Sequence, residues 1–165
     1  DIGQGGDTLQ IDAGATLNGT VTGAWTATSD SRNSGTANLT TAGQAINLAA
    51  VTATGNGWTL TNSGPATSLT GSARNDTLNG GAFDDTLQGS GGNDRITAGA
   101  GGDTVIVDAG TDTFTDLGNG ADVLRITGVT ATVNATVVQA WTSLPPSRVQ
   151  PATTRSPAAM RATIP

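Results

Sequence analysis

The sequence predicts an all-β fold built from short stacked repeats. Gly supplies 24 of the 165 residues and aromatic side chains only 3%. One group of Asp residues recurs every nine positions, and a second, longer repeat links the two ends of the chain. With so few bulky side chains, apolar burial must come from many small contacts between regularly spaced Leu, Ile and Val, which favours a repetitive β architecture.

The charged residues are restricted to two types. All 13 acids are Asp, all seven bases are Arg, and the net charge is −6. Short carboxylates in turns can bind hard cations, and without Cys a bound metal is the usual substitute for a disulfide. An acidic body without basic clusters argues against nucleic-acid binding, and no apolar stretch approaches the roughly 20 residues of a transmembrane helix.

The nine-residue period runs through residues 71–114. Its Asp residues are Asp76, Asp85, Asp94, Asp103 and Asp112. An apolar residue stands two positions after each of them: Leu78, Leu87, Ile96, Val105 and Phe114. The copies read GSARNDTLN, GGAFDDTLQ, GSGGNDRIT, AGAGGDTVI and VDAGTDTFT.

This pattern resembles the RTX, or hemolysin-type calcium-binding, repeat G-G-x-G-x-D-x-U-x. The resemblance implies a tight turn and a very short strand in each nonapeptide, with two nonapeptides in each coil of a parallel β-roll, a type of β-solenoid. It also implies Ca²⁺ between turns stacked on the same side of the roll. Residues 71–126 are therefore expected to form the calcium roll.

The predicted calcium ligands follow from that stacking, since turns on one side recur every second nonapeptide. Asp76 is expected to pair with Asp94, Asp85 with Asp103, and Asp94 with Asp112. Turn carbonyls would contribute near Gly81, Gly92, Gly99, Gly101 and Gly110, and Asp7 and Asp122 are secondary candidates. The alternative is a metal-free β-helix whose Asp and Asn residues only cap turns.

The Asp76 turn is the weakest candidate of the series. The fourth motif position is Gly in three copies but Arg74 and Phe83 in the first two. A bulky residue there makes left-handed backbone geometry costly.

The long repeat aligns residues 1–26 with residues 116–142, with one inserted residue. Asp7, Leu9 and Ile11 fall on Asp122, Leu124 and Ile126, and Trp25 falls on Trp141. A period of about 115 residues predicts a fragment of a tandem array. Residues 1–35 would be the end of a preceding unit and a Thr-rich β segment, and residues 127–142 the start of the next unit.

The segments that flank the roll carry weaker signals. Residues 36–70 are Thr-rich and contain strand cores at irregular spacing, which predicts solenoid coils without ions or, alternatively, a small inserted β-sandwich. Trp25 and Trp58 are interpreted as core residues. Residues 143–165 hold five of the six prolines and predict a disordered tail, for which a linker or a reading-frame error are further explanations.

Catalysis is not expected, because the chain contains no His, Cys, Lys, Glu or Tyr. The predicted function is a calcium-binding structural module of a secreted or cell-surface, adhesin-like repeat protein. Its partners would be Ca²⁺ and neighbouring units of the same chain, and the resemblance implies bacterial type I secretion with folding after export. The alternative is the folding appendage of an extracellular hydrolase whose catalytic domain lies elsewhere.

Overall fold

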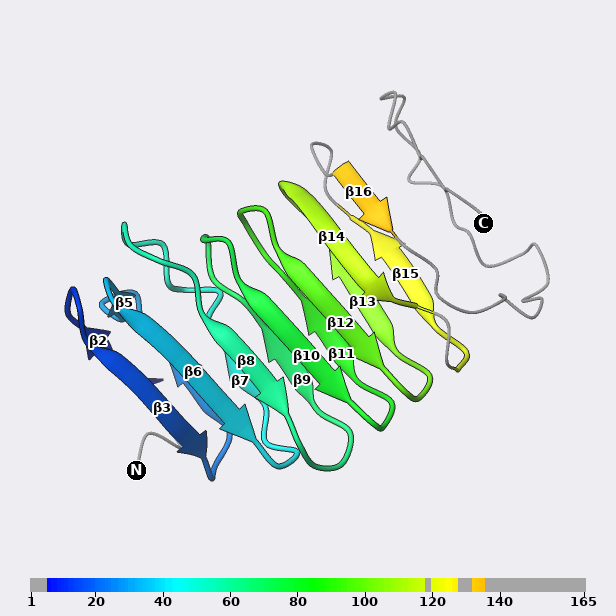
Figure 1. Ribbon diagram of the computed structural model, residues 1–165, viewed down its shortest axis with the longest axis horizontal. Coiled ribbons are helices and arrows are strands. Elements are labelled where there is room, and N and C mark those ends of the chain that lie inside the picture. The colour runs from blue at the N-terminus through cyan, green and yellow to red at the C-terminus, as the bar shows by residue number, and fades with distance from the viewer. Residues whose placement is uncertain (1–5, 118–119, 128–131, 136–165) are drawn as a thin grey trace.

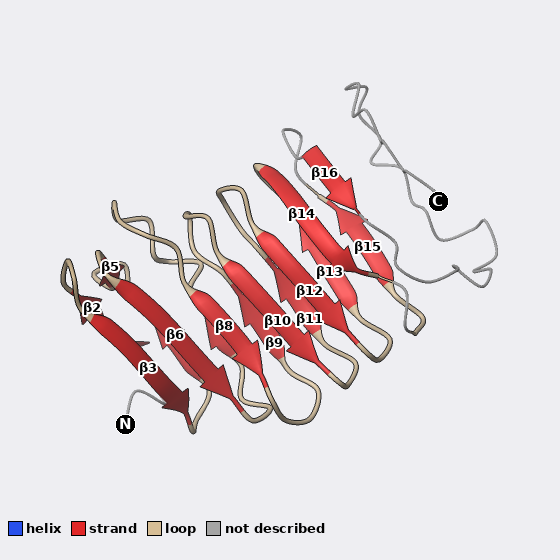
Figure 2. Ribbon diagram, viewed as in Figure 1, coloured by secondary structure: helices blue, strands red, loops and turns tan. Residues whose placement is uncertain are grey.

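The computed structural model describes residues 6–117, 120–127 and 132–135. Every regular element in this part of the chain is a β-strand (Figure 2). The strands coil into a parallel β-solenoid with two seven-stranded sheets, in which the chain advances coil by coil from β1 to β16 (Figure 1). This confirms the predicted all-β solenoid. The predicted disordered tail, residues 143–165, lies outside the described residues.

Each coil contributes one strand to each large sheet. Sheet 1 contains, in spatial order, β1 (Gly6–Asp7), β4 (Trp25–Ala27), β7 (Ile46–Asn47), β9 (Ser68–Thr70), β11 (Thr86–Gln88), β13 (Thr104–Val107) and β15 (Val123–Ile126). Sheet 2 contains β3 (Thr16–Val21), β6 (Thr36–Thr41), β8 (Thr59–Asn62), β10 (Thr77–Gly81), β12 (Arg95–Gly99), β14 (Thr111–Asp116) and β16 (Thr132–Ala135). A small third sheet pairs β2 (Gln10–Ile11) with β5 (Arg32–Asn33).

The strand register shows how many residues make one coil. Thr59 pairs with Thr77, and Thr77 pairs with Arg95, so one coil of the roll is 18 residues, or two nonapeptides. Coils before the roll are longer and less regular, as in the pairing of Ile46 with Leu69. Residues 36–70 form strands of the same two sheets, and therefore belong to the solenoid and not to a separate sandwich.

The core is two stacks of apolar side chains, one from each sheet. The sheet 2 stack is Leu39, Leu60, Leu78, Ile96 and Phe114, and the sheet 1 stack is Ile46, Leu69, Leu87 and Val105. All are almost completely buried, because the side chains of a strand alternate between the inside and outside of the coil. Trp25 and Trp58 are buried too, in an edge-to-face contact with ring centres 6.4 Å apart.

No helix in the described part of the chain is long and apolar enough to cross a membrane.

Candidate calcium site

The repeat Asp residues lie in two ladders, one beside each sheet. The first ladder is Asp76, Asp94 and Asp112, on successive coils at the start of β10, β12 and β14. The second ladder is Asp85, Asp103 and Asp122, immediately before β11, β13 and β15. All six side chains are at most 3% exposed. The structure thus places together the residues of all three predicted pairs.

Within each ladder, a carboxylate accepts a hydrogen bond from the backbone of the preceding coil. In the first ladder the amide of Asp76 donates to Asp94 Oδ1 at 2.8 Å, and the amide of Asp94 donates to Asp112 Oδ1 at 2.9 Å. In the second ladder the amide of Asp85 donates to Asp103 Oδ1 at 2.8 Å. One oxygen of each acceptor therefore fixes the stacking of adjacent turns.

The second oxygen of most ladder carboxylates has no partner. The Oδ2 atoms of Asp85, Asp94, Asp103 and Asp122 are buried and have no hydrogen-bond partner in the described structure. Leaving a buried charged oxygen unsatisfied costs free energy, and the neighbouring ladder carboxylates add like-charge repulsion. These orphan oxygens fit a hard divalent cation, which would satisfy and neutralise them together.

The pKa values of the ladder carboxylates also favour a bound cation. Burial away from water, followed by repulsion from Asp112, Asp76 and Asp108, raises the pKa of Asp94 to about 8. Burial raises the pKa of Asp103 and of Asp112 to about 6, with further repulsion from neighbouring carboxylates. Burial also raises the pKa of Asp85. Without a cation, these groups are therefore costly to ionise.

Asp76 differs from the other ladder residues because both of its oxygens have protein partners. Its Oδ1 accepts the amide of Trp58 at 2.6 Å, and its Oδ2 accepts the amide and the hydroxyl of Ser72. Burial still raises its pKa. Asp76 thus stabilises its own turn. It has no unpartnered oxygen for a cation, whereas Asp94 has one.

The five turn glycines named from the sequence share one backbone property. Gly81, Gly92, Gly99, Gly101 and Gly110 all have positive φ, between 89° and 129°. A Cβ on Gly110 would stand 1.5 Å from the carbonyl oxygen of Gly92 in the coil before it. Glycine is therefore required both by φ and by the close stacking of the turns.

The bulky residues at the fourth motif position adopt another backbone geometry. Ser90 is the one non-glycine residue with positive φ in the described chain, so Arg74 and Phe83 do not occupy the left-handed region. The first two nonapeptide turns consequently depart from the geometry of the later three.

Two features of the ladders were not predicted. Asp122 accepts the amide of Asp103 at 2.9 Å, so Asp103, like Asp94, lies between two ladder neighbours. The nine-residue period did not predict this contact, because Asp122 follows Asp103 after 19 residues and not after 18. Asp108 also lies close enough to repel Asp94 and Asp112, and its buried Oδ1 has no partner. Its only signal in the sequence is an acid at the second motif position.

Asp7, the other secondary candidate, is not in a ladder in this chain. It lies in β1 at the first edge of sheet 1 and is only partly buried. Its carbonyl oxygen accepts the indole N–H of Trp25 at 3.3 Å.

A cation at these ladders would need backbone oxygen as well as carboxylates. No three acidic side chains in the described ranges converge to hold a metal by themselves. Calcium accepts six to eight oxygens from carboxylates and carbonyls alike, so two carboxylates from successive coils plus turn carbonyls suit it. When bound, the ion would supply positive charge between stacked turns. The Asp side chains would hold it, and the glycines let the turns approach closely.

Comparison with known proteins supports this assignment. The RTX calcium-binding nonapeptide repeat, in a form with four copies, matches residues 70–105 and 79–114. The search of curated proteins and the search of solved structures gave no match. The matched segment coincides with the aspartate ladders and the 18-residue coils. Residues 70–114 are therefore RTX calcium-binding nonapeptide repeats.

Proposed function

We propose that this chain is a calcium-dependent structural module of a secreted or cell-surface tandem-repeat protein, and that Asp76, Asp85, Asp94, Asp103, Asp112 and Asp122 hold the ions. The observation that carries the proposal is the set of buried, unpartnered carboxylate oxygens on successive coils. The apolar stacks alone make a narrow core, so neutralising these oxygens decides whether the roll is stable.

The size of the calcium effect can be estimated. Extracellular calcium modules have dissociation constants of roughly 10⁻⁴ to 10⁻³ M. At a calcium concentration tenfold above the dissociation constant, each site adds about 1.4 kcal/mol to the free energy of unfolding. Four ladder sites would add about 6 kcal/mol, which is comparable to the whole stability of a small domain.

This dependence suits a protein that folds after export. In calcium-poor cytosol the ladder carboxylates repel one another and destabilise the roll, whereas extracellular calcium drives folding by binding only the folded state. The repeat of about 115 residues supports a tandem array whose units contact mainly their neighbours. It favours an array over a single roll attached to a hydrolase.

The test is far-ultraviolet circular dichroism of the complete chain in chelator and then in millimolar calcium. We expect the β-sheet signal to rise cooperatively with calcium, whereas magnesium at equal concentration, with its demand for octahedral geometry, leaves it largely unchanged. An identical, fully folded spectrum in chelator would exclude calcium-dependent folding.

A further inference from the structure

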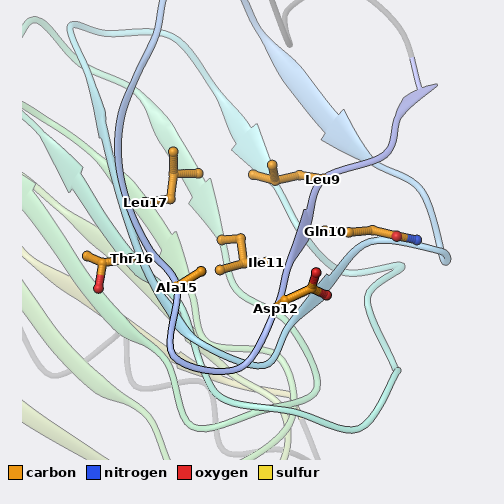
Figure 3. A pocket seen from close by; sticks show the side chains of 7 residues that line it. All are labelled: Leu9, Gln10, Ile11, Asp12, Ala15, Thr16 and Leu17. Atoms are coloured by element: carbon orange, nitrogen blue, oxygen red, sulfur yellow. The ribbon is translucent and has the colours of Figure 1, made fainter.

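Apolar side chains line a hollow at the edge of the described solenoid that contains β1 and β3. Strands β1 and β3 are the edge strands of the two sheets. Beside them, Leu9, Ile11, Ala15 and Leu17 line a hollow of about 270 Å³ (Figure 3). Leu9 and Leu17 pack on the core but remain partly exposed. Open strand edges and exposed apolar side chains are a template for another strand layer.

The second copy of the long repeat shows how the same segment packs when a roll coil precedes it. Residues 116–126 repeat residues 1–11, and β16 begins at Thr132, the residue that the alignment matches to Thr16 at the start of β3. In that second copy, β15 pairs with β13 and β16 pairs with β14. The opening segment of a long unit therefore stacks on the last coil of a calcium roll.

The two copies differ at one acidic residue in the way that this stacking requires. Asp122 is 3% exposed and accepts the amide of Asp103, and its Oδ2 has no partner. Asp7, which the alignment matches to it, is partly buried, and its strand β1 is the edge strand of sheet 1 in the described residues. Asp7 and Asp122 are equivalent in sequence but differ in burial. This difference indicates that a preceding roll coil buries this Asp.

We infer that the first end of this chain binds the last roll coil of another copy of the unit, the coil equivalent to residues 103–114, and that Asp7 then joins its second ladder. The register of β15 on β13 places Leu9 beside Val105 of the preceding copy, as Leu124 lies beside Val105 here. The first strands of each unit would thus pair with the last strands of the calcium roll in the unit before it. The calcium role of Asp7 rests on the proposed function, whereas the stacking does not.

The experiment uses a tandem chain in which residues 1–115 precede the complete 165-residue chain, so that one Asp7 lies at the junction and the other at the free end. Asp7→Asn is made at either position, and bound calcium is measured by equilibrium dialysis. We expect the junction variant to lose about one ion per chain, or to bind it at least tenfold more weakly. The free-end variant is the matched control and should bind as the parent does.

Hydrogen exchange gives a second measurement that does not depend on the variants. Peptides from residues 8–11 and 16–21 occur twice in the tandem chain, and in calcium they should give two isotope envelopes of equal area, one protected. A single envelope together with unchanged calcium binding in both variants overturns the inference while leaving the proposed function intact. A parent tandem chain that binds no calcium refutes the proposed function, and two envelopes would still support the stacking.

Discussion

The coils before the roll and the coils of the roll share one fold but satisfy their buried turns with different chemistry. Before the roll, neutral side chains close the turns: Asn33 donates to the carbonyl of Gly57 at 2.6 Å, and Thr41 both donates to and accepts from Gln44. An amide or hydroxyl can act as donor and acceptor, so such a turn is complete without an ion.

In the roll, buried carboxylates lie at the turns beside the strands. An ionised carboxylate only accepts hydrogen bonds, and stacking uses one oxygen of Asp94 or Asp103 and leaves the other buried without a partner. The roll also lacks the tryptophan pair that fills the earlier coils. We therefore expect coils closed by amides and hydroxyls to be stable without an ion, whereas the proposed calcium sites would stabilise the coils closed by carboxylates.

The largest expected effect is the removal of calcium. In chelator we expect amides of residues 77–116 to lose their protection against hydrogen exchange, because the ladder oxygens are then uncompensated. Amides of residues 36–62 should keep more of theirs, because their turns are closed by neutral groups. Hydrogen exchange with mass spectrometry measures both regions in one sample. Equal loss of protection in the two regions would mean that calcium stabilises the whole solenoid and not the roll alone.

The next effect separates two positions within the first ladder. Asp94→Asn should weaken calcium binding about tenfold or more, since Asp94 lies between two ladder neighbours and has an orphan oxygen. In chelator at pH 8 the same variant should be no less stable than the parent, because a neutral amide removes a buried charge. Calorimetric titration and urea unfolding measure the two quantities.

Asp76→Ala is the matched comparison for that variant. It removes the acceptor for the amides of Trp58 and Ser72, so it should lower the free energy of unfolding by about 1–3 kcal/mol even without calcium. Its effect on calcium affinity should be smaller than that of Asp94→Asn. If Asp76→Ala weakened calcium binding more, the assignment of the ion to the orphan oxygens would be wrong.

A smaller effect concerns pH in the absence of calcium. The folded pKa values of Asp94, Asp103 and Asp112 lie above the ordinary value of 3.8, so the folded chain binds more protons than the unfolded chain between about pH 4 and pH 8. Stability of the calcium-free roll should therefore be greatest near pH 4 and fall as pH rises to 8, by up to about 1.4 kcal/mol per pH unit for each proton.

Urea unfolding in chelator at pH 4.5, 6 and 8 measures this slope. Asp94→Asn should flatten the slope between pH 6 and pH 8 in particular, because Asp94 is the group with a pKa of about 8. Calcium affinity should rise over the same range, since the ion competes with these protons. A stability that increased with pH would contradict the burial of uncompensated carboxylates.

The strict period made the roll predictable, while features outside that period were not. Leu78, Leu87 and Ile96 recur at fixed spacing, so the stacked core was predictable from the motif, and the RTX resemblance implied the coil of two nonapeptides. The Asp103 to Asp122 step of 19 residues breaks the count, so the length of the second ladder needed coordinates. Asp108 acts through space on residues of two other turns, a relation that no local pattern encodes.

The smallest effect tests the backbone geometry of a single turn. Ser90 has a φ of 71°, a conformation that glycine adopts without the steric cost of a Cβ, and its neighbours in the motif series at Gly81 and Gly99 are glycine. Ser90→Gly should therefore raise the free energy of unfolding of the calcium-bound chain by about 0.5–1 kcal/mol. Thermal unfolding in calcium measures this gain.

The control, Gly99→Ala, should lower the free energy of unfolding, because a Cβ there would stand 2.0 Å from the carbonyl oxygen of Gly81. A loss of stability in Ser90→Gly would mean that the Ser90 side chain contributes more to this turn than its backbone strain costs.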